Sequence, residues 1–129
     1  RLDIGRRLIG YSNACRDISD GLIKDLENIC DNSNLKATIF LNQIPLSRNA
    51  KKVKQNIEKN TNFWELVLCF GEDYELVFSM SKKNKKVFEK NKTHHKLFKV
   101  GSIRNDRQIN IYQKDLTKIK LNFSGFSHF

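Results

Sequence analysis

The chain has 129 residues, the length of a single domain, and 39% of them are hydrophobic, which argues against intrinsic disorder. It holds 24 Lys and Arg residues against 14 Asp and Glu residues, a formal net charge of +10 at pH 7. No apolar run is long enough to cross a bilayer, so we expect no association with a membrane.

The first half of the chain alternates helical and extended patterns. Apolar residues predict a short helix over residues 2–10. Residues 14–20 read as a short strand or a turn that enters a helix over 21–32, where apolar side chains recur on one helical face. Alternation of apolar and polar residues predicts a strand over 36–42, and the Lys-rich stretch 48–60 predicts a weak, exposed helix.

The second half contains more extended segments. Residues 63–70 are apolar and fit either a strand or a short buried helix, whereas residues 116–121 are too mixed to assign. A solvated helix is predicted over 82–92, and strands are predicted over 74–80, 97–103 and 108–112. We therefore expect one α+β (α/β) domain over residues 1–129, in which helices pack on a mixed, mainly antiparallel sheet.

Composition leaves the class of partner open. The basic excess is typical of a nucleic-acid-binding domain, of attraction for a phosphorylated ligand or an acidic partner, and of a sequence biased toward Lys. The Lys-rich stretches 51–59 and 82–99 have few aromatic residues and no recognised nucleic-acid motif, so we expect no specific nucleic acid partner. The three cysteines form no C-x-x-C pair and are interpreted as thiols of a reducing, cytoplasmic environment.

Two short windows contain nine of the fourteen acidic residues. In the first, Asp17-Ile18-Ser19-Asp20-Gly21 is a D-x-S-D-G sequence before a predicted helix. Carboxylates at such a turn suit Mg²⁺, Gly21 permits close approach of a ligand, and free N–H groups at the helix start suit phosphate. The alternative is a capping turn, in which Ser19 or Asp20 caps the helix and the other residues are solvated.

The second window, residues 65–75, includes most of the sequence Gly71-Glu72-Asp73-Tyr74-Glu75-Leu76 at the start of a predicted strand. In an extended chain, Glu72 and Tyr74 face one side, and Asp73 and Glu75 face the other. Two interpretations fit this pattern. The acids either have their charge compensated by a bound cation, or they face solvent after a turn.

Several segments together resemble the C-terminal domain of bacterial thiamine-monophosphate kinase, which belongs to the aminoimidazole ribonucleotide synthetase-related superfamily. The matching segments occur in family order over the whole chain. They are RLDIG at residues 1–5, ACRDISDGL at 14–22, DL at 25–26, IPLS at 44–47, GEDYEL at 71–76 and GFSHF at 125–129. The resemblance implies an α/β domain with a mixed sheet, like the C-terminal domain of the aminoimidazole ribonucleotide synthetases.

The resemblance also implies an activity and roles for individual residues. The family transfers a phosphoryl group from ATP to thiamine monophosphate and forms thiamine diphosphate, with Mg²⁺ as cofactor. Asp17 and Asp20 match metal ligands, Ser19 matches an ATP-contacting residue beside Gly21, and Glu72 and Phe126 match substrate-contacting residues. Two departures, Arg16 in place of an apolar residue and Phe70 in place of Gly, put the metal site and the pose of Glu72 in question.

The sequence does not begin with Met, and we expect it to be part of a longer protein. In the family, an N-terminal domain supplies further metal ligands, much of the nucleotide site and the homodimer interface, so the isolated chain is expected to be inactive. The alternatives are a non-catalytic binding or regulatory module on the same fold and a basic nucleic-acid-binding domain.

Overall fold

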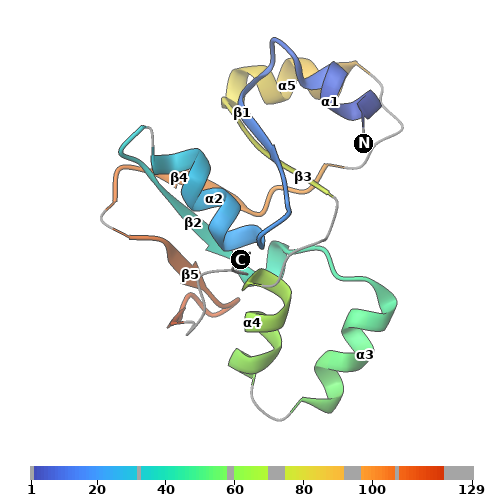
Figure 1. Cartoon of the computed structure of the whole chain (residues 1–129), viewed down its shortest axis with the longest axis vertical. Helices are drawn as coiled ribbons and strands as arrows, with labels where there is room; N and C mark the ends of the chain where they lie inside the picture. The colour runs from blue at the N-terminus through green and yellow to red at the C-terminus, as the bar shows by residue number, and fades with distance from the viewer. Residues whose placement is uncertain are drawn as a thin grey trace.

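The computed structural model describes residues 2–31, 33–57, 60–69, 75–91, 97–106 and 108–120 (Figure 1). Helices and strands alternate along these residues, which confirms the predicted α+β class. In chain order the elements are α1 (Leu2–Leu8), β1 (Ser12–Asp17), α2 (Leu22–Asp31), β2 (Lys36–Phe40), the 3-10 turn η1 (Leu41–Gln43), α3 (Arg48–Asn56), α4 (Asn60–Cys69), β3 (Leu76–Met80), α5 (Lys82–Lys90), β4 (Gly101–Arg104), β5 (Asn110–Tyr112) and β6 (Lys118–Ile119).

The described strands form two sheets. β1 and β3 pair antiparallel, with Asp17 opposite Leu76. The larger sheet has the order β4-β2-β5-β6, and it is antiparallel except between β2 and β5. The larger sheet is therefore mixed and mainly antiparallel, as predicted.

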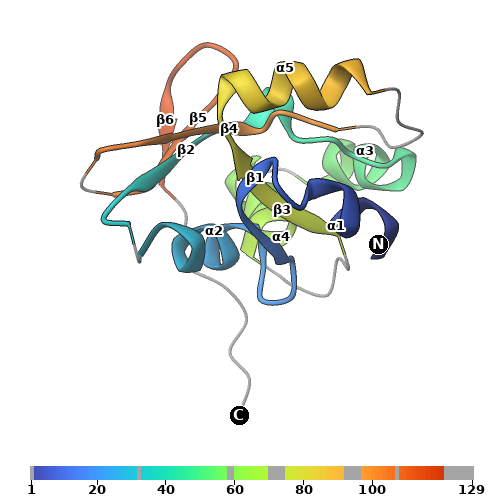
Figure 2. The same cartoon turned by 90° about the horizontal axis from the view of Figure 1, so that it is seen from above.

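The main hydrophobic core joins α2 and α4 to the larger sheet. Leu26 and Cys30 of α2, Leu68 of α4 and Ile39 of β2 are all buried in it. Figure 2 shows α2 lying alongside the sheet that contains β2, β4 and β5. Because complete burial of one aliphatic side chain is worth about 1.5–3 kcal/mol, this core fixes the position of α2, which begins just after the D-x-S-D-G sequence.

A second, smaller cluster holds β3, the partner strand of β1. Ile4 and Leu8 of α1 are buried against Phe88 of α5, and Leu76 and Phe78 of β3 pack on them. The second cluster holds β3, β1 pairs with β3, and the main core holds α2, so both ends of the turn between β1 and α2 are fixed.

The observed elements differ from the predicted ones at a few places. Residues 14–20 contain the end of a strand, β1, followed by a turn, and residues 63–70 belong to a helix, α4. The edge strand β4 of the larger sheet begins at Gly101, so the strand predicted from residue 97 was too long. In the part of the chain that the structure describes, no helix combines the length and the apolar character that a membrane span requires.

Candidate functional site

The D-x-S-D-G sequence forms the connection between β1 and α2, here called the Asp17–Gly21 turn. Asp17 is the last residue of β1. The pairing with β3 extends one step further, because the Ile18 N–H donates to the Glu75 carbonyl oxygen at 2.8 Å. Asp17 is exposed, and Ser19 and Asp20 are half-buried. The three predicted ligand-binding side chains therefore lie on one short turn, at the surface of the molecule.

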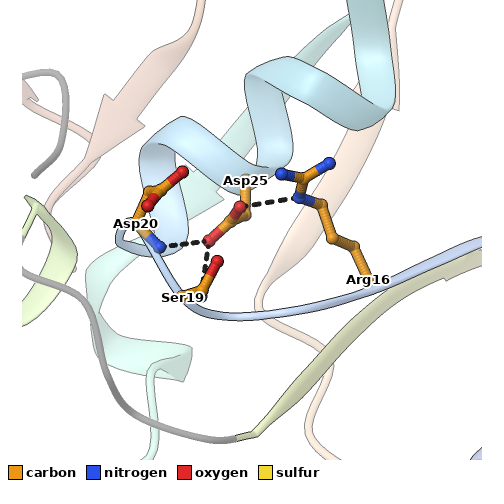
Figure 3. A network of polar contacts seen from close by, with 4 residues as sticks. All are labelled: Arg16, Ser19, Asp20 and Asp25. Carbon is orange, nitrogen blue, oxygen red and sulfur yellow. Dashed lines mark hydrogen bonds and ion pairs between the residues drawn. The ribbon is translucent and has the colours of Figure 1, made fainter. Parts of the chain in front are cut away.

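The turn is built around a buried carboxylate, Asp25 of α2 (Figure 3). Its side chain has no exposed surface. Oδ2 accepts the backbone N–H groups of Ser19 at 2.9 Å and Asp20 at 3.1 Å, while Oδ1 accepts Nε–H of Arg16 at 2.7 Å. Both oxygens of the buried carboxylate thus have donors, as a buried charge requires.

This network uses two backbone groups of the turn, because the N–H groups of Ser19 and Asp20 are bonded to Asp25. The free N–H groups that we expected for a phosphate belong to the start of α2 at Leu22, and their role stays a prediction. The capping alternative also takes a different form, because the carboxylate that accepts these N–H groups belongs to the helix itself. The groups that the turn offers to a ligand are therefore its side chains more than these two N–H groups.

Arg16 lies next to Asp17 in the sequence, but its guanidinium is paired with Asp25. Successive residues of a strand point to opposite faces, so Arg16 on the α2 side leaves Asp17 directed away from it. The positive charge of Arg16 is compensated by the negative charge of Asp25. Arg16 therefore pairs with Asp25 in the structure, and its effect on a cation at Asp17 stays a prediction.

Gly21 makes a close backbone contact with the end of α4. Its φ is +112°, and a Cβ at this position would lie 2.7 Å from the carbonyl oxygen of Cys69. The close approach that we expected of a ligand is thus made by another part of the chain. Contact of Gly21 with a nucleotide remains a prediction.

Replacing Gly21 with Ala should lower the free energy of unfolding by about 3 kcal/mol, through backbone strain at positive φ and displacement of α4. Urea denaturation of the purified chain measures this value. Gly10→Ala is the matched control, since Gly10 also has a positive φ, +85°, but nothing lies within 4 Å of its would-be Cβ. Equal losses in the two variants would show that the contact with Cys69 contributes nothing.

Cys69, whose carbonyl group lies against Gly21, has a buried thiol. Burial raises its pKa to about 11, and the carboxylates of Glu65 and Glu27 act in the same direction. The thiol is therefore protonated at neutral pH, whereas a metal binds the thiolate.

The described residues on the two sides of the second acidic window border the same turn. Residues 70–74, which include Glu72 and Phe70, lie outside the described residues, as does Phe126. The residues on either side of 70–74 are described, and both contact the turn. Cys69 lies against Gly21, and Glu75 accepts the N–H of Ile18. The fold therefore brings the ends of the second window to the first, although the sequence separates them by some fifty residues.

The donor chemistry of the turn fits a hard divalent cation. Asp17 and Asp20 offer carboxylate oxygens, which Mg²⁺ prefers, together with water and ligand phosphates. No group of three or more His, Cys, Asp or Glu side chains that could hold a metal occurs among the residues described above. A cation at this turn would need additional ligands from a bound phosphate, from water or from another part of the protein.

The sequence contained a signal for Asp25 that our prediction did not use. On α2, Asp25 follows Leu22 by three positions and precedes Ile29 by four, which places a carboxylate on the apolar face. A charge on a buried helix face needs partners, and the nearest polar segment is the turn that precedes the helix.

Comparison with known proteins identifies relatives over the whole chain. Residues 4–114 match the family described as AIR synthase related protein, C-terminal domain. Thiamine-monophosphate kinase of Buchnera aphidicola subsp. Schizaphis graminum is 39% identical over 132 residues, which cover 100% of this chain and 39% of that protein. The enzyme of the same name from Bacillus subtilis is 27% identical and is again covered over 39% of its length.

Solved structures show the same fold. AaThiL complexed with AMPPCP and TMP superposes with a TM-score of 0.73 at 27% identity, over 100% of this chain and 38% of that one. Thiamine-monophosphate kinase from Stenotrophomonas maltophilia K279a also gives a TM-score of 0.73, at 25% identity, over 86% of this chain and 34% of that one. The chain thus spans about two fifths of the length of the curated relatives it matches end to end.

Proposed function

The chain belongs to the family of AIR synthase related C-terminal domains. We propose that it forms the C-terminal part of a thiamine-monophosphate kinase. The proposed reaction transfers the γ-phosphoryl group of ATP to thiamine monophosphate and gives ADP and thiamine diphosphate. Similarity to kinases of this name along the entire chain supports the proposal, as does the fold shared with a protein complexed with AMPPCP and TMP.

One structural observation carries the assignment of the site. The Asp17–Gly21 turn presents two carboxylates and a hydroxyl, and both described ends of the segment that contains Glu72 contact this turn. In the proposed enzyme, Asp17 and Asp20 hold Mg²⁺, Ser19 and Gly21 contact ATP, and Glu72 and Phe126 contact thiamine monophosphate.

In the proposed reaction these residues position the cation and the phosphates and form no covalent bond. An oxygen of the monophosphate attacks the γ-phosphorus, and the bond from that phosphorus to the β,γ-bridging oxygen breaks. Bound Mg²⁺ would neutralise the charge on the phosphate oxygens, which is the main requirement of phosphoryl transfer. The turn contributes by holding carboxylates and a hydroxyl at fixed positions beside the phosphates.

The proposed enzyme needs a second domain. Among the described residues there is no cluster of three acidic or other metal-binding side chains, and the two carboxylates of the turn would fill only part of the coordination sphere of a cation. We assign the remaining cation ligands to an N-terminal domain, which would also complete the nucleotide site and form a homodimer in a cytoplasmic enzyme. The relatives named above are kinases, and they give no support to a regulatory module or a nucleic-acid-binding domain.

A chimeric enzyme tests the proposal. This chain replaces the matching 39% of the Schizaphis graminum Buchnera relative, and thiamine diphosphate formed from ATP, Mg²⁺ and thiamine monophosphate is measured by chromatography. We expect turnover within about tenfold of the intact relative, a change of about 1.4 kcal/mol in the barrier. The relative's N-terminal part alone is the control and should be inactive. A folded chimera that binds ATP but forms no thiamine diphosphate would contradict the proposal.

A further inference from the structure

Asp25 is an unusual residue for the position it occupies. It lies on the face of α2 that also carries Leu22 and Leu26, both buried in the main core. A carboxylate at such a position gives up its hydration, and an apolar residue of similar size would serve packing at least as well. Stability alone therefore does not account for an acid at this place in the fold.

The contacts of Asp25 join three parts of the chain. Its own backbone belongs to α2, Oδ1 accepts Nε–H of Arg16 on β1, and Oδ2 accepts the N–H groups of Ser19 and Asp20 in the turn. Figure 3 shows Arg16 and Asp20 on the two sides of Asp25, with the Ser19 backbone close to the same carboxylate. One side chain thus sets the turn's backbone relative to both the strand before it and the helix after it.

Arg16 supplies an ion-pair partner for this buried carboxylate. The ion pair is short, 2.7 Å, and Arg16 itself keeps 41% of its side chain exposed, so only one of the two charges is fully buried. A charged carboxylate accepts backbone N–H groups more strongly than a neutral acid or an amide does. The pair thereby stiffens the turn that it underlies.

We infer that Asp25 is a positioning residue, which holds the Asp17–Gly21 turn in the conformation that presents the Asp20 carboxylate and the Ser19 hydroxyl to a cation and a phosphate. The part of this inference that concerns the cation and phosphate rests on the function proposed above. Asp25 is buried and does not itself touch the ligand. Its contribution is to remove backbone freedom that the turn would otherwise lose on binding.

Asp25→Asn is the informative substitution, because Asn has nearly the same shape but only one acceptor oxygen. If that oxygen accepts the turn's N–H groups, the Asn amide group faces Nε–H of Arg16, and two donors oppose each other. In the other orientation, the amide group opposes the N–H groups of Ser19 and Asp20. The variant therefore cannot satisfy both sides, and the turn loses its fixed backbone.

The experiment uses the 129-residue chain and NMR spectroscopy, with Mn²⁺ as the probe. Asp25→Asn should raise the amide exchange rates of Ser19 and Asp20 by about tenfold or more, because their shared acceptor is lost. Paramagnetic broadening of the turn's signals should then need about tenfold more Mn²⁺, since carboxylates bind Mn²⁺ as they bind Mg²⁺.

Two further variants make the result specific. Asp31→Asn changes an exposed acid on the same helix, which has only a 3.5 Å ion pair with Lys36, and it should leave exchange and broadening unchanged. Arg16→Gln combined with Asp25→Asn should restore slow exchange, because the Gln oxygen accepts from the Asn amide group and frees the Asn oxygen for the turn. In the same double variant the Mn²⁺ concentration needed for broadening should return toward the wild-type value, and a merely structural role for Asp25 would not predict that return.

The outcomes separate the inference from the proposed function. Wild-type exchange rates at Ser19 and Asp20 in Asp25→Asn, or unchanged Mn²⁺ broadening despite faster exchange, would overturn the inference. If the wild-type chain showed no Mn²⁺ broadening at the turn, the turn would not bind a cation without the ligands of a second domain, and the metal role would be decided by the chimeric enzyme. The exchange rates and the rescue would then decide by themselves whether Asp25 positions the turn.

Discussion

Asp17→Asn and Asp20→Asn should each reduce the turnover of the chimeric kinase by about a hundredfold or more, a loss of about 2.7 kcal/mol in transition-state stabilisation. Asn keeps the size of Asp and can still cap a helix, but it lacks the charge that attracts a divalent cation. Asp17 is exposed at the end of β1, so its substitution should leave the fold intact. Turnover across a range of Mg²⁺ concentrations, together with the melting temperature of each variant, measures the effect.

The capping alternative predicts the opposite pattern for the same variants. If the acids of the turn only cap α2 or face solvent, turnover stays near that of the parent, and the stability changes by about 1 kcal/mol or less. Asp31→Asn, on the same helix but far along it, serves as the control in the chimera and should keep both turnover and Mg²⁺ dependence. Parental Mg²⁺ dependence in both Asp17→Asn and Asp20→Asn would show that the assigned metal roles are wrong.

The regular spacing of apolar residues made the helices and most strands predictable from the sequence. On α2, the apolar residues recur at helical spacing, and the same residues form the buried face. Residues 63–70 were ambiguous because Phe63, Trp64 and Leu68 fit a buried strand as well as a buried helix. Only packing decides between them, and all three side chains are buried in the helix that packs on α2.

The residues of the candidate site could be predicted from the sequence, but the contacts among them could not. Asp17, Ser19 and Asp20 could be selected because acids and a hydroxyl occur together before a helix. The role of Asp25 depends on the path of the turn, which brings two N–H groups to one carboxylate, and the contact of Gly21 with Cys69 joins residues far apart in the sequence. Such contacts are set by tertiary packing, which local patterns do not encode.

The isolated chain, given ATP, Mg²⁺ and thiamine monophosphate, should form thiamine diphosphate at less than about a thousandth of the chimera's rate. Two carboxylates on one turn leave most of the coordination sphere of a cation to water and phosphate. Without further protein ligands, the phosphates of ATP are not held in line with the attacking oxygen, and the gain from orientation is lost.

The same chain should recover activity when the N-terminal part of the Buchnera relative is added in trans. The recovery should depend on the concentrations of both parts, because the site forms only in their complex. Coupled detection of ADP and chromatography of thiamine diphosphate measure it, and the chain with both Asp17→Asn and Asp20→Asn is the control. Turnover by the unsupplemented chain at a rate near that of the chimera would contradict the need for a second domain. The Asp17–Gly21 turn would then have to bind the cation and both phosphorylated substrates with residues of this chain alone.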